Sequence, residues 1–285
     1  MSRFVIGEQG NFQLFCARGD RLGCILEQIA ITRERAFRGV KQGTGNELDT
    51  DSCDPLYSHI WVWDTERRQI AGAYRAVNAG KLIREHGMEC LYASKVIHFE
   101  QNFVEKFDHM VELGRTFITP EYQKEPLLLD MLWKGICHFL LLNPECHTFI
   151  GTVSISQDYT RRAMSFLLNA FMQHFSVPVE MTRLIHPRYP FEPEESRFLS
   201  HQASDCKTVA QINKALASLQ PGKAIPVLIR RYLSLNAEFL SFVVTPPRDS
   251  LDGLCLLDVR KAPRSYRKRY LGPMGKQRFE QKWGC

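Results

Sequence analysis

Hydrophobic and polar positions along the chain follow two periods, which predict helices and strands. Apolar residues recur at helical spacing from Ala17 to Phe37 and from Arg161 to Phe175, and the apolar run from Leu127 to Leu142 predicts a long helix. Segments rich in β-branched and aromatic residues predict strands at SHIWVWD, IAGAYRAV, MVELGRTFIT and HTFIGTVSIS. The turn TERRQ joins the first two strands and predicts a hairpin.

The order of these segments predicts an α/β fold. Three strands, a long helix and a further strand indicate a mixed central sheet with a crossover helix between its two central strands. Pro226 to Leu235 predicts another helix, and Glu238 to Val244 with Leu254 to Val259 predicts a closing hairpin. We therefore expect a single domain over residues 1–285.

Two segments differ from this core in composition. Residues 176–223 are rich in proline and charge, contain a helix signal from Val209 to Leu219, and are expected to form an inserted helical and loop segment. The tail, residues 260–285, contains the basic run RSYRKRY. We expect this tail to be loosely held against the rest of the chain.

Composition restricts the class of protein. The 285 residues, 44% hydrophobic and 24% charged, are typical of a globular chain. The formal net charge of +6 indicates an acidic partner such as an acyl carrier protein, an anionic membrane surface or nucleic acid, with a merely soluble basic protein as the alternative. Nine cysteines without a CxxC pair fit neither a secreted disulfide framework nor structural zinc.

Nothing in the sequence predicts export or membrane insertion. The N-terminal segment MSRFVIGEQG lacks a basic stretch followed by an apolar run. The apolar run from Leu127 to Leu142 is interrupted by Asp130, Lys134 and His138. We therefore expect a cytoplasmic protein that, if it acts on lipids, associates peripherally with the inner face of the membrane.

The most specific feature is the block ELGRTFITPEYQKEPLLLDMLWKGICHFLLLNPE, followed by FIGTVSIS. It places Glu112 and Arg115 three residues apart, so on an extended strand they face opposite sides unless a bulge intervenes. Arg33 and Phe37 are four residues apart and share one face of the predicted helix. These residues are the first candidates for a functional site, with a strand-edge ion pair and surface packing as the alternatives.

This block resembles the hemolysin-like branch of the GNAT superfamily, the amino-acid N-acyltransferases that make ornithine lipids, glycine lipids and N-acyl amino acids. The segments RERAF, GNELDTDSCD, IAGAYR, LIRRYLSLNAEFLSF and LDGLCLLD extend the resemblance over most of the chain. The chain is more distantly similar to the acyl-homoserine-lactone synthases. The resemblance implies a GNAT-like sheet whose central strands splay apart to admit the pantetheine arm of an acyl thioester.

The resemblance also implies an activity. A long-chain, 3-hydroxylated fatty acyl group would pass from acyl carrier protein to the α-amine of an amino acid, ornithine or glycine, with no bound cofactor and no metal. Glu112 would take a proton from the ammonium, directly or through water, because only the neutral amine can attack. Arg115 would hold the acceptor carboxylate or stabilise neighbouring acidic groups. Tyr232 would protonate the departing thiolate, with Tyr159 as the second candidate.

The remaining site residues are assigned by the same resemblance. Acceptor binding would fall to Arg33, Phe37, Glu47, Asp49, Asp54 and Arg75, with Asp51 in the same acidic loop. A solvated acidic loop or a calcium site is the alternative, although the spacing does not match an EF-hand. Donor binding would fall to Phe117, Ile118, Thr119, Gln123, Lys124 and Ser154, with a backbone N–H near Phe117 to Thr119 for the oxyanion.

The acyl donor is predicted from a segment that differs from the family pattern. TPEYQKEPLLLD stands where acetyl-CoA-binding members carry a glycine-rich loop for pyrophosphate. This favours the 4′-phosphopantetheine thioester of acyl carrier protein, a co-substrate with a single phosphodiester. Basic side chains would steer the acidic carrier. The candidates are Lys124, Lys134, Arg161 and Arg162.

Three other mechanisms or functions are weighed. A covalent route through Cys137 and His138 is disfavoured, because helical neighbours point about 100° apart. Acyl-homoserine-lactone synthesis from S-adenosylmethionine is the second enzymatic hypothesis. A non-catalytic basic module for membranes or nucleic acid rests on RSYRKRY alone, so we expect no nucleic-acid partner.

Overall fold

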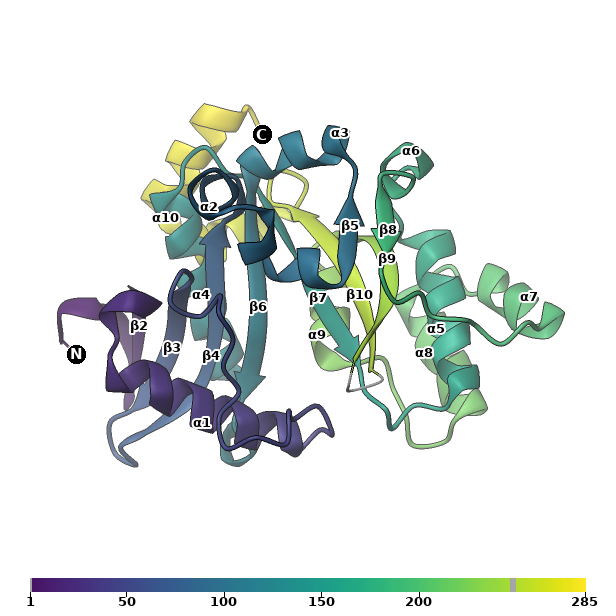
Figure 1. Ribbon diagram of the computed structural model, residues 1–285, viewed down its shortest axis with the longest axis horizontal. Coiled ribbons are helices and arrows are strands. Elements are labelled where there is room, and N and C mark those ends of the chain that lie inside the picture. Colours follow the sequence, from purple (N-terminus) through teal and green to yellow (C-terminus); the bar gives the residue numbers. More distant parts are fainter. Residues whose placement is uncertain (1, 247–249) are drawn as a thin grey trace. The chain divides into compact units, whose positions relative to one another are not determined.

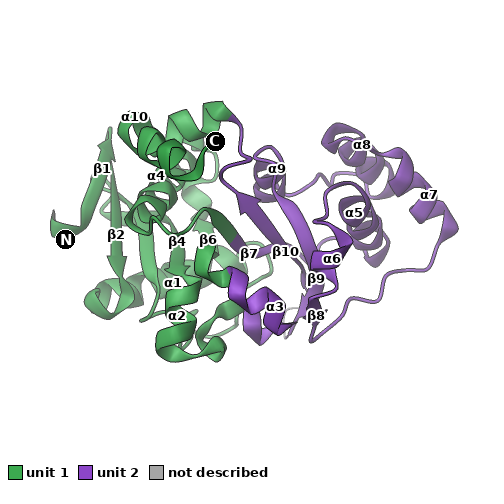
Figure 2. Ribbon diagram, turned by 90° about the horizontal axis from the view of Figure 1, so that it is seen from above, with its two compact units in different colours: residues 1–92, 107–149, 264–285 green, residues 93–106, 150–263 purple. Residues whose placement is uncertain are grey.

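The structure, a computed structural model, describes residues 2–246 and 250–285 (Figure 1). Its contacts divide the chain into two compact units (Figure 2). Unit 1 comprises Met1–Tyr92, Phe107–Phe149 and Arg264–Cys285, and unit 2 comprises Ala93–Lys106 and Ile150–Pro263. Each unit therefore joins segments that are far apart in the sequence.

Unit 1 is built on antiparallel strands in the order β1-β2-β3-β4-β6. Their bounds are Val5–Gln9, Phe12–Arg18, Ser58–Asp64, Gln69–Asn78 and Met110–Ile118. The predicted hairpin is confirmed as β3 and β4, and the ELGR block lies on β6. Residues 70–78 of β4 are all buried, which explains the nearly continuous apolar run in this strand.

Helices cover both faces of this part of the sheet. They are α1 (Cys24–Arg38), α2 (Ala79–His86), α4 (Pro126–Leu142) and α10 (Arg264–Trp283). Figure 2 shows α1 and α2 on one face and α4 and α10 on the other. Gly135 lets α4 approach the strands closely, because a Cβ atom there would collide with the Ile60 side chain.

Unit 2 contains most of β7 (Thr148–Ile155) and the antiparallel hairpin of β9 (Glu238–Thr245) and β10 (Ser250–Asp258). A second small sheet pairs β5 (Ile97–Phe99) with β8 (Ile185–Pro187). The helices of unit 2 are Gln101–Val104 (α3), Arg161–His174 (α5), Val179–Thr182 (α6), Arg197–Asp205 (α7), Val209–Leu219 (α8) and Val227–Leu233 (α9). Short 3-10 turns lie at Ser2–Phe4, Gly19–Arg21, Met88–Cys90, Tyr92–Lys95, Glu105–His109 and Pro120–Tyr122.

The predicted fold class, α/β with a sheet flanked by helices, is confirmed. The predicted closing hairpin is also confirmed, although residues 247–249 of its turn lie outside the described residues. The predicted insertion contains α8 as expected and also α7. The single-domain organisation and the splaying of the central strands stay predictions.

Two predictions for unit 1 are wrong. The helix predicted from Ala17 begins at Cys24, because Phe12–Arg18 pairs along its whole length with β3 and these ladder bonds override the local spacing. The tail predicted to be loosely held is the helix α10. It is fixed to α4 by Asp130, which accepts a hydrogen bond of 2.6 Å from the Tyr270 hydroxyl and one of 2.8 Å from Arg269.

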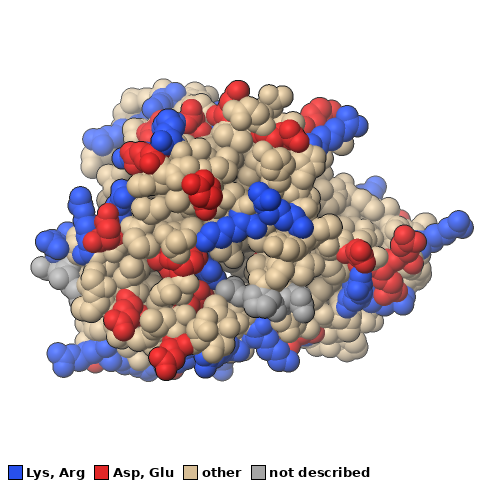
Figure 3. All heavy atoms as spheres, viewed as in Figure 1, with Lys and Arg blue, Asp and Glu red and all other residues tan. Residues whose placement is uncertain are grey.

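Surface and covalent features complete the description. All nine cysteines are free. Among the described residues, no helix combines the length and the apolar character needed to cross a membrane. On the face that Figure 3 shows, basic and acidic side chains are interspersed over the surface and do not gather into one extended basic patch.

Candidate active site

The strand β6 carries a β-bulge within the ELGR block. Ala73 and Arg75 of β4 pair with Phe117 and Gly114 of β6, so β6 has one extra residue in this interval. Arg115 lies in the bulge and has a positive φ of 52°, which is uncommon for a residue other than glycine. The surrounding contacts must therefore hold Arg115 in this conformation.

The bulge brings Glu112 and Arg115 to one neighbour, Tyr92. The Tyr92 backbone N–H donates to Glu112 Oε2 over 3.0 Å, and the Arg115 guanidinium lies 4.9 Å from the Tyr92 ring centre. The sequence left open whether the two side chains share one side of the strand. The structure answers that they converge, because the extra residue reverses the alternation after Gly114.

Glu112 is buried, with 2% of its surface exposed, and accepts hydrogen bonds from neutral donors. The Tyr57 hydroxyl donates to Oε2, the same oxygen that the Tyr92 N–H reaches. Burial and the charge of Glu112 raise the pKa of Tyr57 well above its ordinary value, so this hydroxyl keeps its proton and remains a donor. Hydrogen bonds from these two neutral donors stabilise the charged form of a carboxylate.

Next to Glu112, three arginines and three aspartates form a closed circuit of alternating charge, which we call the ion-pair ring. Each aspartate links two arginines and each arginine links two aspartates. The ring balances its own charge, and its members come from α1, the loop before β3, β4 and β6. In order, they are Arg33, Asp54, Arg75, Asp51, Arg115 and Asp49.

Asp54 joins the two most buried arginines of the ring. Arg33 bonds both of its carboxylate oxygens, over 3.3 Å and 2.7 Å, and Arg75 Nη1 donates to Oδ1 over 2.7 Å. Burial alone would raise the pKa of Asp54, but the Arg33 and Arg75 guanidinium groups bring it below its ordinary value. The Asp54 carboxylate is therefore charged at neutral pH.

Arg115 completes the ring from the bulge. Its Nη1 and Nη2 donate to Asp49 Oδ2 over 3.3 Å and to Asp51 Oδ2 over 3.2 Å. Asp49 leads back to Arg33, whose Nε lies 3.5 Å from Asp49 Oδ2. Arg115 is the most exposed guanidinium of the three, with 10% of its side chain exposed against 1% for Arg33. It is thus the member of the ring best placed to meet a ligand.

Three further residues of the site escape sequence reasoning. The rings of Tyr57 and Tyr92 lie 4.7 Å and 5.2 Å from the Arg75 guanidinium, in cation–π contact. His59 pairs with Arg75 in the β3–β4 register, and its Nε2 lies 2.9 Å from the Asp54 carbonyl oxygen. Burial lowers the pKa of His59 to about 4, so the imidazole is neutral and donates to that oxygen. The β3–β4 alternation could have indicated His59, but no motif marks the tyrosines.

Two of the predicted acceptor-binding residues, Asp49 and Asp54, lie in the ion-pair ring, and their role stays a prediction. The carboxylates of Asp49 and Asp54 are buried and bound by Arg33, Arg75 and Arg115, so they do not form an open site for an ammonium group. The alternative of a solvated acidic loop is wrong for the same two residues. Asp49 contacts Arg115 directly, whereas Asp54 contacts Arg33 and Arg75.

Two other predicted acceptor residues lie outside the ring. Glu47 is exposed to solvent. Phe37 is half-buried and packs edge-on against Phe117, with ring centres 6.4 Å apart. Both rings belong to or border an apolar cluster that includes Trp61. For Phe37 the structure therefore supports the packing alternative.

The predicted donor-binding residues on and after β6 divide into backbone and side-chain groups. The Thr119 N–H donates to the Ala71 carbonyl over 3.0 Å, so this amide is already engaged with β4 and is a poor oxyanion donor. Successive amides point to opposite edges of a strand, so the Ile118 N–H points away from β4. Gln123 and Lys124 are exposed beyond the turn Pro120–Tyr122.

The remaining predicted residues lie in unit 2. Tyr232 is buried on α9, and Ser154 is half-buried on β7, so their roles stay predictions. The second candidate proton donor, Tyr159, donates its hydroxyl hydrogen to the Ala224 carbonyl oxygen over 2.5 Å. That proton is thus already in a hydrogen bond, which makes Tyr159 a weaker candidate.

Two buried cysteines beside histidines, Cys137 and Cys146, do not offer a nucleophile. Burial raises the pKa of Cys137 to about 12, and its Sγ lies 3.5 Å from the Tyr266 hydroxyl oxygen. Burial also raises the pKa of Cys146 to about 12. Since the thiolate is the reactive species, both residues are unreactive at neutral pH, which supports direct attack by the acceptor.

Residues 32–134 match the family model described as "Acetyltransferase (GNAT) domain". This segment is similar to GNAT acetyltransferases. It contains the whole ion-pair ring together with Glu112, Tyr57, Tyr92 and His59. The similarity to GNAT domains thus falls on the part of the chain that forms the candidate active site.

Two curated relatives are similar over a longer stretch. A glycine N(alpha)-acyltransferase of Bacteroides thetaiotaomicron is 29% identical over 256 residues, which are 84% of this chain and 74% of the relative. A glycine N(alpha)-acyltransferase of Phocaeicola vulgatus is 29% identical over 231 residues, 76% of this chain and 70% of that relative. Among solved structures, a CoA-dependent acyl-homoserine lactone synthase, MesI, aligns over 95% of both chains with 12% identity and a TM-score of 0.39.

Proposed function

We propose that the protein is an N-acyltransferase that joins a long-chain, 3-hydroxylated fatty acyl group to the α-amine of glycine. The observation that carries this proposal is the convergence of Glu112 and Arg115 on Tyr92 across the bulge of β6. A carboxylate and a guanidinium side by side match the ammonium and the carboxylate of a small amino acid. The activity of the two relatives, which are glycine N(alpha)-acyltransferases, favours glycine over ornithine as the acceptor.

Glu112 starts the reaction by taking a proton from the glycine ammonium, because the protonated nitrogen has no lone pair. With 2% of its surface exposed, the carboxylate receives this proton directly or through one water. Arg115, held by Asp49 and Asp51, binds the glycine carboxylate and fixes the nitrogen in position.

The neutral nitrogen then attacks the thioester carbonyl carbon. The C–N bond forms and the carbonyl oxygen becomes an oxyanion. The backbone N–H of Ile118, which points away from β4, is proposed to donate a hydrogen bond to this oxyanion. Collapse of this intermediate breaks the C–S bond and releases the thiolate, and the nitrogen loses its second proton to give the amide. Tyr232 is proposed to protonate the thiolate. The second proton of the nitrogen passes through solvent to the resulting tyrosinate, and Glu112 releases the first proton to solvent.

The donor is proposed to be the 4′-phosphopantetheine thioester of acyl carrier protein. The chain has a 3-10 turn, Pro120–Tyr122, and exposed Gln123 and Lys124 before α4, where acetyl-CoA-binding relatives carry a glycine-rich loop. A single phosphodiester needs fewer contacts than a pyrophosphate. The long-chain product would pass to the inner face of the cytoplasmic membrane, where the protein is proposed to work peripherally.

The test is a reaction of the purified protein with 3-hydroxyhexadecanoyl carrier protein and one acceptor at a time, read by mass spectrometry. We expect N-acylglycine as the main product, with ornithine a poorer acceptor and S-adenosylmethionine giving no lactone. Hexadecanoyl-CoA in place of the carrier thioester tests the donor. A lactone, or no amide with any acceptor, would overturn the proposal.

A further inference from the structure

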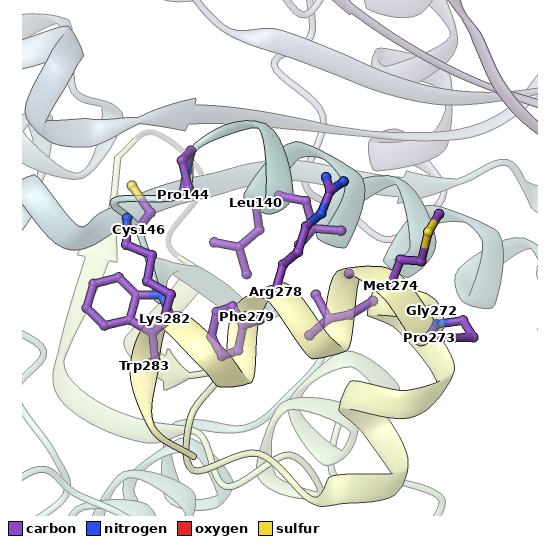
Figure 4. A pocket seen from close by; sticks show the side chains of 13 residues that line it. Leu140, Pro144, Cys146, Gly272, Pro273, Met274, Arg278, Phe279, Lys282 and Trp283 are labelled. Carbon is purple, nitrogen blue, oxygen red and sulfur yellow. The ribbon is translucent and has the colours of Figure 1, made fainter.

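A second candidate site lies in unit 1, between the C-terminal half of α4 and the second half of α10. It is a groove of about 660 Å³, a size typical of small-molecule sites. Its lining is mainly apolar and includes Leu140, Leu141, Pro144, Met274 and Phe279. Figure 4 shows the labelled members Leu140, Pro144, Met274 and Phe279 along the two helices.

The two ends of the groove are preformed. At one end α10 is interrupted at Gly272, which has a positive φ of 69° and precedes Pro273. At the other end Trp283 packs edge-on against His147, with ring centres 4.5 Å apart. The groove is therefore set by the backbone and by a fixed aromatic ring.

Two cations border this apolar lining. Arg278 and Lys282 are exposed and four residues apart, so they lie on one face of α10, and both line the groove. Among the described residues neither forms an ion pair, and Lys282 lies over the Trp283 ring at 5.4 Å. Figure 4 shows Arg278 rising from α10 beside Leu140.

Three other cations of α10 form ion pairs with acidic residues. Arg269 lies 2.8 Å from Asp130, and Arg267 and Lys276 lie 3.6 Å and 3.1 Å from Glu280. Arg278 and Lys282 thus keep a positive charge for a ligand at the edge of an apolar groove. An apolar interior with two cations at its edge is complementary to one hydrocarbon chain with an anionic head.

The geometry points to a binding site for a free single-chain amphiphile with a carboxylate head, of the N-acyl amino acid class. The acyl chain would lie between α4 and α10, and the carboxylate would meet Arg278 and Lys282. The choice of an N-acylglycine rests on the proposed function, because that molecule is its product. That the ligand has one hydrocarbon chain and an anionic head is inferred from the groove itself.

The test is equilibrium dialysis of the intact protein with N-hexadecanoylglycine below its micelle-forming concentration. We expect saturable binding at one site, and the neutral methyl ester should bind about tenfold more weakly or worse. The double variant R278E/K282E should weaken binding of the acid by a similar factor. K268E changes an exposed cation of the same helix outside the groove and should leave binding unchanged.

Two further measurements keep the result decisive. Leu141→Trp should abolish binding by filling the groove, while far-ultraviolet circular dichroism confirms that the helices remain. Equal affinity for acid and ester, unchanged binding in R278E/K282E, or association with anionic vesicles but not with the free acid would overturn the inference. Glu112→Gln should bind normally. In the parent protein, intact binding without any acyl transfer would refute the proposed function alone, and acyl transfer without binding in the groove would refute the groove alone.

Discussion

The Arg115 guanidinium lies 3.3 Å from the carboxylate of Asp49, and this contact closes the ion-pair ring at the bulged residue of β6. Arg115, whose backbone φ is positive, is thereby held from two directions, because its guanidinium also contacts Asp51. The ring is buried but internally balanced, which is the condition under which buried charges are tolerated. We expect the ring to hold the Arg115 guanidinium in a fixed position for the acceptor carboxylate.

Arg115→Lys should impair the acceptor step. An ammonium cannot reproduce the two divergent contacts to Asp49 and Asp51 and still present the planar N–H edge that binds a carboxylate. We expect kcat/KM for glycine to fall about 10- to 100-fold, the equivalent of one charged hydrogen bond. The matched control is Arg35→Lys, which alters an exposed ion pair with Glu121. Equal kinetics in the two variants would contradict the role of Arg115.

Asp54→Asn should destabilise the fold. The change leaves Arg33 and Arg75 buried with one fewer counter-charge, and breaking a buried pair in this way costs about 3–5 kcal/mol. Urea unfolding measures the loss. Glu47→Gln in the same acidic loop removes an exposed carboxylate and should change the free energy of unfolding by less than about 0.5 kcal/mol. A small effect at Asp54 would mean that the ring does not support the fold.

His59 should make the free energy of unfolding depend on pH. Its pKa is about 4 in the fold, against an ordinary histidine value of 6.5, so between these values the unfolded chain binds more protons. Stability is therefore complete above pH 6.5 and falls as the pH drops toward 4, by about 3 kcal/mol in total. His59→Gln keeps a donor for the Asp54 carbonyl and should flatten this part of the curve. An unchanged slope would place the titrating group elsewhere.

Cys137→Ala should leave acyl transfer nearly intact. The buried thiol has a pKa of about 12 and cannot supply a thiolate at neutral pH. Loss of a true nucleophile lowers kcat by about 10⁴-fold or more, so the two mechanisms are easily separated. The assay is initial rate with carrier-protein thioester, with melting temperature as the control for packing. Inactivation without unfolding would revive a covalent route.

Much of the fold could be predicted from the sequence because its strands are strongly patterned. SHIWVWD became β3 with the predicted bounds, and the run from Leu127 became α4 with one residue added. The start of the first helix was misplaced, since the pairing of β2 with β3 involves residues at least 40 positions apart. The prediction for the tail was wrong because it considered the basic residues alone. Tyr266 and Tyr270, which lie among them, pack against Trp133.

The candidate site was predictable in its members more than in its arrangement. Arg33, Arg75, Glu112 and Arg115 were all candidates, but no sequence spacing shows that three aspartates bind three arginines in a circuit. The sequence shows that a bulge would bring Glu112 and Arg115 to one side of the strand, but it does not show that the bulge is present. Its presence depends on how β4 pairs with β6. Tyr92 follows a segment without clear periodicity and enters the site through tertiary contacts alone.

The central claim is that Glu112 receives the proton of the attacking amine, and one variant tests it directly. Glu112→Gln retains an acceptor oxygen for the Tyr57 hydroxyl and the Tyr92 N–H but cannot take a proton. With carrier-protein thioester and glycine at neutral pH, we predict that kcat/KM falls about 10²- to 10⁴-fold while the melting temperature stays close to that of the parent protein. Full activity in Glu112→Gln would contradict the account.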